Sequence, residues 1–222
     1  MVYTTTQMEE MKQEFINLLR STNRPGIDEL INWLDTKSDF FTAPASCFYH
    51  GAYPGGLVAH SLNVYKAAKQ IQQMASSLAL PEKNVMSIPE DSLIICALMH
   101  DLCKTNIYSE TVKMYKDDNA PYGQQWKKYQ SYEIKDNFPL GHGEKSVIML
   151  QNFIRLSAIE ICAIRWHMGM TDPGAYLSPY EKPAMMKAIN DIPLVYILMQ
   201  ADGFASFMME KEVDQKIANA IN

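Results

Sequence analysis

The chain has 222 residues, of which 47% are hydrophobic, and this is enough to form one large domain with a sizeable core. Its net charge is −5, its pI is about 5.5, and no block of basic residues stands out. This balance argues against duplex DNA or an anionic membrane surface as the main partner. No run is long enough to span a bilayer, and residues 1–15 lack the apolar core of a secretion signal.

Two short amphipathic helices are expected at the start of the chain. Apolar residues at helical spacing predict helices over residues 6–19 and 27–34, and Arg24-Pro25-Gly26 separates them. We therefore expect residues 1–38 to form a helical extension packed on the core of a larger domain, which covers residues 39–222.

A long helix is predicted over residues 57–80, after the pair Gly55-Gly56. The loop before it, residues 39–52, is rich in aromatic and small side chains and contains His50. It either lines the mouth of a pocket or is an ordinary connection. One face of the predicted helix carries His60, Val64, Ala67, Ile71, Met74 and Leu78.

The most informative stretch is residues 91–104, DSLIICALMHDLCK. It is almost entirely apolar from Ser92 to Met99, which predicts a buried helix. The helix then ends in the adjacent pair His100-Asp101, with Lys104 one turn further on. An unpaired buried charge is costly, so a metal ion bound by this pair is the simplest explanation.

Residues 105–139 are polar and aromatic and predict a β-hairpin, with alternating strands at 112–115 and 129–134. The run WKKYQSY mixes basic and aromatic side chains. Such a run either stacks on a base or nucleotide, or belongs to an exposed hairpin whose charges are simply solvated.

The last part of the chain is expected to be helical. Helices are predicted over residues 144–156, 158–168 and 182–189, and from Pro193 onwards, with a Pro/Gly/Tyr loop at 171–183. Ser157 and Glu160 form a capping box before the second of them. Three side chains stand out: His142 between two glycines, His167 at the end of an apolar helix, and Asp202 within an apolar stripe.

These anomalies form one set of candidate metal ligands, because a helix bundle builds metal sites from inward side chains on facing helices. The set is His60, His100, Asp101, His142, His167 and Asp202. Imidazoles and carboxylates favour divalent transition metals such as Fe, Mn, Ni, Co or Zn, with Mg as an option at one site. Six ligands suit two ions bridged by Asp101.

The four cysteines, Cys47, Cys96, Cys103 and Cys162, show no CxxC spacing. Cys96 and Cys162 lie in apolar helical patterns. We interpret all four as reduced core residues of a cytoplasmic protein, with a thiolate metal site as the alternative.

The ordered ligand set resembles the HD-domain superfamily of metal-dependent phosphohydrolases. His60 in GGLVAHSLNV, the doublet His100-Asp101 in ALMHDLCK and Asp202 in LMQADGFAS match its motifs. His142 and His167 match the extra ligands of the two-metal branch, and YHGAYPGGLVAHSLNV is similar to exoribonuclease-like and phage-type HD hydrolases. No GYP triplet follows, and Cys103 stands where glycine is common.

The resemblance implies an all-α helical bundle with a small β-hairpin insertion at residues 105–139. It also implies a phosphohydrolase or phosphodiesterase in which a metal-activated water attacks phosphorus. The substrate would be a small phosphoester, a nucleotide or a short single-stranded nucleic acid.

Asp101 and Lys104 would be catalytic, since Lys104 shares a helical face with the doublet and would balance phosphate charge. Its alternative role is a surface lysine just past a helix end. Lys145 would contact the substrate. His50 would either contact the substrate or lie behind the metal ligands, and Arg165 would either contact phosphate or point outward. Two alternatives stay open: a mixed-valence di-iron oxygenase with the same ligands, and a non-catalytic nucleotide-binding scaffold.

Overall fold

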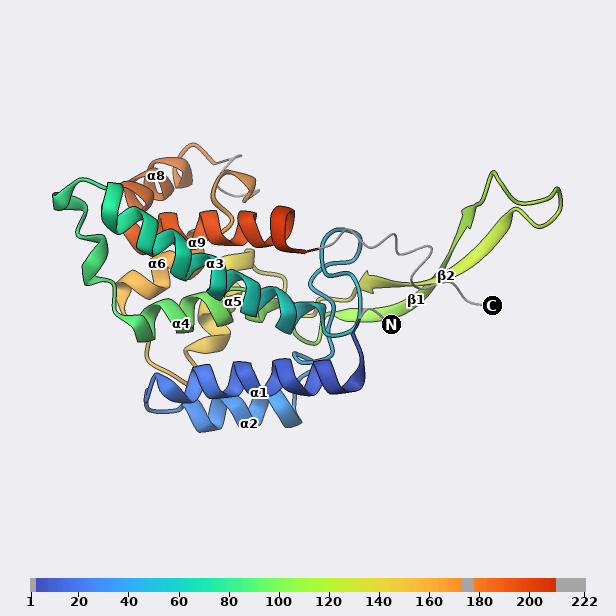
Figure 1. The fold of residues 1–222 in the computed structure, drawn as a ribbon, viewed down its shortest axis with the longest axis horizontal. Coiled ribbons are helices and arrows are strands. Elements are labelled where there is room, and N and C mark those ends of the chain that lie inside the picture. Colours follow the sequence, from blue (N-terminus) through green and yellow to red (C-terminus); the bar gives the residue numbers. More distant parts are fainter. Residues whose placement is uncertain (1–2, 173–177, 211–222) are drawn as a thin grey trace.

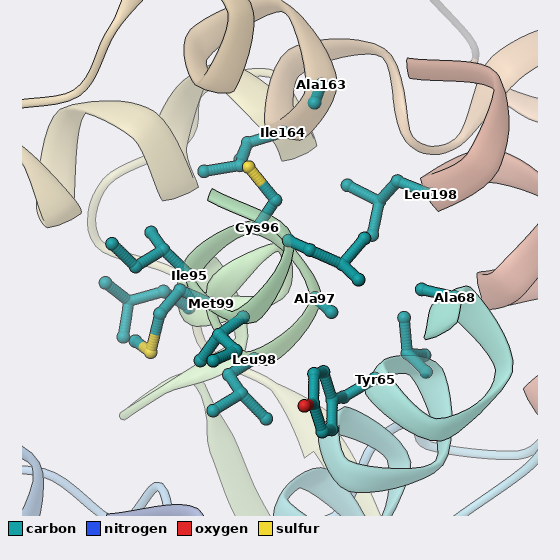
Figure 2. Close-up of a cluster of buried hydrophobic side chains, with 14 of the residues drawn as sticks. Tyr65, Ala68, Ile95, Cys96, Ala97, Leu98, Met99, Ala163, Ile164 and Leu198 are labelled. Atoms are coloured by element: carbon teal, nitrogen blue, oxygen red, sulfur yellow. The ribbon is translucent and has the colours of Figure 1, made fainter. Parts of the chain in front are cut away.

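Helix α4 (Glu90–Met99) is apolar on every side and lies at the centre of a helical bundle. Its residues from Ser92 to Met99 are all buried. Figure 2 shows side chains of α4 packed among residues of three other helices, including Tyr65 from α3, Ile164 from α6 and Leu198 from α9. The structure, a computed structural model, describes residues 3–172 and 178–210.

The all-α architecture with a small hairpin is confirmed for the described residues. The other α-helices described are α1 (Thr5–Ser21), α2 (Ile27–Thr36), α3 (Gly56–Leu78), α5 (His142–Leu150), α6 (Ala158–Trp166), α8 (Glu181–Asp191) and α9 (Pro193–Phe204). Short 3₁₀ turns are Pro81–Lys83, Val85–Ser87, Leu102–Lys104 and Gly169–Thr171, and a π-helical turn, η5 (Ala205–Met209), follows α9.

The predicted hairpin is present and longer than the sequence pattern indicated. Strands β1 (Tyr108–Lys116) and β2 (Trp126–Ile134) pair antiparallel, with Tyr108 opposite Ile134 and Lys116 opposite Trp126. The hairpin extends away from the helices (Figure 1). Trp126 is exposed, and stacking of this strand on a base remains a prediction.

Helices α1 and α2 lie side by side along one flank of the bundle (Figure 1). Phe15, Leu19, Leu30 and Leu34 are fully buried in the same hydrophobic cluster as α4. The proposed boundary between an extension and the larger domain at residue 38 therefore remains a prediction.

The apolar stripe of α3 was predicted too long. It is buried as far as Ala68, but Met74 and Leu78 are exposed. Helix α3 has 23 residues and α4 only 10, so α3 is about 20 Å longer. Its last turns therefore extend beyond α4. Helix α5 likewise ends earlier than predicted, at Leu150, whereas the capping box of Ser157 is confirmed.

Within residues 3–172 and 178–210, no single helix has the length and apolar character to cross a membrane, although the bent pair Glu181–Asp191 and Pro193–Met209 together meet that test. Part of the predicted loop at 171–183, namely residues 173–177, lies outside the described residues.

Candidate metal centre

Five helices bring the predicted ligands to one place. His60 lies in the second turn of α3, the pair His100-Asp101 directly follows α4, and His142 begins α5. His167 directly follows α6, and Asp202 lies in α9. Short contacts join these side chains into one cluster, as predicted.

Two glycines allow the supporting backbones to approach closely. An added Cβ at Gly56 would overlap the carbonyl oxygen of Gly51, so the preceding loop packs directly on the start of α3. An added Cβ at Gly143 would overlap the carbonyl oxygen of Arg165, so α5 begins against the end of α6. This second approach brings the rings of His142 and His167 to a centroid separation of 5.3 Å.

The tautomers of two buried histidines are set by the backbone. Nδ1 of His100 donates to the carbonyl of Ala97 at 2.9 Å, and Nδ1 of His167 donates to the carbonyl of Ile164 at 2.7 Å. Each Nε2 therefore carries a lone pair, which is the form that binds a metal. Nε2 of His167 is buried and has no hydrogen-bond partner among the described residues, as expected of a nitrogen that would bind a metal ion.

The spacing of the donor atoms fits a common ion. Nε2 of His60 lies 3.2 Å from Nε2 of His100, 3.3 Å from Oδ1 of Asp202 and 3.5 Å from Oδ2 of Asp101. Donors bound at about 2.1 Å to one tetrahedral or octahedral ion lie about 3.0–3.4 Å apart. Converging acceptor atoms at this spacing repel one another unless a proton or a metal cation lies among them, and the set of imidazoles and carboxylates fits a divalent transition metal.

The Asp101 carboxylate faces two groups of ligands. Its Oδ2 lies 3.3 Å from Nε2 of His100, on the side of His60. Its Oδ1 lies 2.6 Å from Nε2 of His142 and 3.7 Å from Nε2 of His167. Two of the ligand groups that could hold an ion share this carboxylate: one adds His100 and His167, and the other adds Cys103 and His142.

The charges of the cluster also favour a cation. Burial lowers the pKa of His60, but hydrogen bonds to Asp202 and Glu210 outweigh burial and raise it to about 9. Burial raises the pKa of Asp101, yet the charge of Lys104 and the nearby imidazoles hold it well below its usual range. The ionised carboxylates thus favour a positive charge on the buried His60 ring, and a divalent ion bound there would take the place of that proton.

Lys104 joins the cluster as predicted from its spacing. Its Nζ lies 2.7 Å from Oδ2 of Asp101, and its side chain is 14% exposed. Lys104 is therefore mostly buried beside Asp101, and it does not lie on the surface as the alternative role would require. The 3₁₀ turn Leu102–Lys104 brings the ammonium back to the carboxylate that begins the turn.

Only some of the clustered side chains are exposed to solvent. The side chains of His60, His100 and His167 are buried, whereas those of His142 and Asp202 are 29% and 17% exposed. His142 and Asp202 are therefore the ligand candidates that a molecule from solvent can reach most directly.

Two residues predicted to contact substrate have other partners. The Arg165 guanidinium contacts the carboxylates of Glu144, Asp172 and Glu181. The Lys145 ammonium lies 2.6 Å from Asp136. The structure does not bring either into the ligand cluster, and their contact with substrate remains a prediction.

His50 does lie beside the cluster, with its ring centroid 4.7 Å from that of His60. Its partner is Glu210, which the sequence analysis missed: the carboxylate accepts from both His50 and His60. Cys103, interpreted above as a reduced core cysteine, is buried with its Sγ 3.4 Å from Nδ1 of His142. Together with Asp101 and His142 it forms one of the groups that could hold an ion.

Comparison with known proteins agrees with this geometry. The HD domain matches residues 57–206, more than half of the chain. The chain is 28% identical over 193 residues to the dihydroneopterin 2′,3′-cyclic phosphate phosphodiesterase of Methanocaldococcus jannaschii. That alignment covers 83% of the chain and 66% of the relative, so the chain spans about two thirds of its relative's length. A search of solved structures finds no significant match. The chain therefore belongs to the HD domain family.

Proposed function

We propose that this protein hydrolyses a small nucleotide-like phosphodiester at a centre of two divalent metal ions. The observation that carries the proposal is the position of Asp101 between two groups of donors, each facing a different carboxylate oxygen. The relative from M. jannaschii acts on a 2′,3′-cyclic phosphate, which makes cyclic phosphodiesters the first substrates to test.

The donor sets support two ions. His60, His100 and Asp202 form one group on the Oδ2 side of Asp101, and His142 and His167 lie on its Oδ1 side. Divalent ions held there would lower the pKa of an attacking water and offset charge on the phosphoryl oxygens. Asp101 itself would hold both ions at the separation that the reaction needs.

The chain's own residues would orient the substrate. The Lys104 ammonium is held beside the metal-facing carboxylate, so it adds a fixed positive charge for a phosphate oxygen. His50 is 20% exposed next to the cluster, where it would contact the bound substrate. The buried imidazoles would exclude bulk water from the face opposite the opening.

The test is turnover by protein stripped of metal and reloaded with Mn, Fe, Co, Ni or Zn. Substrates would be an aryl phosphodiester, 2′,3′- and 3′,5′-cyclic nucleotides, and short single-stranded RNA. We expect metal-dependent hydrolysis of a small phosphodiester, with the 2′,3′-cyclic compounds preferred, and loss of that activity in Asp101→Asn.

Three results would contradict the proposal. Turnover of long RNA alone would show that the substrate is not a small phosphodiester. Full activity with one ion per chain would show that a second metal ion is not needed. Oxygen-dependent turnover by a di-iron form without phosphodiesterase activity would replace hydrolysis altogether.

A further inference from the structure

Glu210 connects two histidines that lie on different segments. Its Oε1 accepts from Nδ1 of His60 at 2.8 Å, and its Oε2 accepts from Nδ1 of His50 at 2.8 Å. The Glu210 side chain is 2% exposed, so both bonds are shielded from water. A buried carboxylate that uses each oxygen on a different imidazole fixes the orientation of both rings.

The turn after α9 places this carboxylate. The π-helical turn η5 closes with a hydrogen bond from the backbone N–H of Glu210 to the carbonyl of Ala205 at 3.1 Å. Such wider turns recur at functional sites. Asn63, one turn after His60 on α3, lies 3.5 Å from Oε1 and adds a weak donor, so the carboxylate is held from α3 as well as from the loop.

The bond to Glu210 determines which nitrogen of His60 faces the metal centre. If Nδ1 donates its proton to Glu210, then Nε2 is the nitrogen with the lone pair, and it is Nε2 that faces His100 and Asp202. The Glu210 carboxylate, 2.8 Å from Nδ1, is the acceptor that leaves Nε2 for a metal ion.

A third cation between His50, His60 and Glu210 is the competing explanation, since their donor atoms also lie close together. It would require both nitrogens of His60 to bind metal, because Nε2 already belongs to the central cluster. The two separations of 2.8 Å are ordinary hydrogen-bond lengths, with one oxygen for each ring. The geometry is that of a hydrogen-bonded bridge.

We infer that Glu210 is a positioning residue that sets the tautomer of His60 for metal binding and holds His50 at the edge of the centre. The inference rests on the metal centre proposed above. Glu210 and His50 both lie outside the matched HD domain, residues 57–206.

The test measures the dissociation constant of Zn²⁺ by competition with a chelator. Glu210→Met fills the space without an acceptor, and we expect it to weaken binding by about 10–100-fold, the usual effect of losing a partner behind a ligand. Glu210→Gln keeps one oxygen that can accept from His60, so it should restore affinity to within a few fold. His50→Ala should also bind nearly as wild type.

A matched control is Glu90→Gln, at the other end of α4, where the carboxylate bonds to Tyr65 and Lys69; its affinity should not change. A second measurement needs no variant: long-range ¹⁵N–¹H spectra of the Zn²⁺-loaded wild type should show the proton on Nδ1 of His60. It also covers the case in which Glu210→Met does not fold.

These experiments distinguish failure of the positioning role of Glu210 from failure of the proposed metal centre. Wild-type affinity in Glu210→Met, or a metal rather than a proton on Nδ1 of His60, would overturn the positioning role. Loss of one bound ion in His50→Ala would do the same in favour of a third cation. A wild type that binds no metal would refute the metal centre itself, whatever the variants do.

Discussion

Oδ1 of Asp101 lies 2.6 Å from Nε2 of His142, while the other oxygen of the same carboxylate faces Lys104. His142 begins α5 and Asp101 follows α4, so this contact joins the start of α5 to the end of α4. The carboxylate thereby lies between two groups of nitrogen donors, and its substitution should affect both.

Asp101→Asn should abolish phosphodiesterase activity and reduce the number of bound ions. The amide is neutral and has only one acceptor oxygen, so it cannot bridge the two groups. The loss of affinity should exceed the 10–100-fold typical of residues behind the ligands. Metal content after gel filtration, with activity on an aryl phosphodiester, measures both effects; unchanged metal content would show that Asp101 is not a ligand.

Lys104→Met should lower kcat by about 10²-fold, the usual effect of removing one group that stabilises developing charge. Metal content should change little, since the ammonium is not a ligand. Lys187→Met is a control, because Lys187 is 79% exposed on α8 and pairs with Asp191 on the same helix. A wild-type kcat in Lys104→Met would show that Lys104 does not take part in the reaction.

Arg24 should be important for stability rather than activity. Its guanidinium contacts Asp91, at 2.7 Å, and Glu160, whose side chain is fully buried. Arg24→Met would leave the Glu160 charge buried without its cation, which costs about 3–5 kcal/mol. Urea unfolding measures this loss.

The matched comparison is Arg20→Met. Arg20 and Asp28 pair at 3.3 Å with side chains 59% and 82% exposed, and exposed pairs contribute about 0–1 kcal/mol. If Arg24→Met and Arg20→Met unfold at the same urea concentration, the buried charge of Glu160 is compensated in another way.

Gly143→Ala should destabilise the protein by about 1–3 kcal/mol and weaken metal binding. The added methyl group would overlap the Arg165 carbonyl and push α5 away from α6, which separates His142 from His167. Gly141→Ala is a milder neighbour, because its Cβ would meet only the carboxylate end of Glu144, which can rotate. Equal effects of the two substitutions on metal affinity would contradict this role of Gly143.

The ligands within the helices could be predicted because each interrupts a local pattern. His60 shares a face with apolar residues, His100-Asp101 ends an apolar helix, and Asp202 stands in an apolar stripe. Such interruptions can be read from residues that are close in the sequence, and the same short-range pattern predicted the hairpin and the capping box.

The partners that depend on long-range contacts could not be predicted. Glu210 is eight residues after Asp202, so about 100° per residue places it about 80° away on a regular helix; the π-helical turn changes that relation. Arg165 meets carboxylates from three separate segments, a convergence that no local pattern reveals.

The central claim is that these side chains bind metal around Asp101, and the most direct test is the metal content of purified protein by mass spectrometry. We predict close to two equivalents of a divalent transition metal in the wild type, with a clear loss in Asp101→Asn. A wild-type protein that hydrolyses phosphodiesters at full rate with no bound metal would contradict the account.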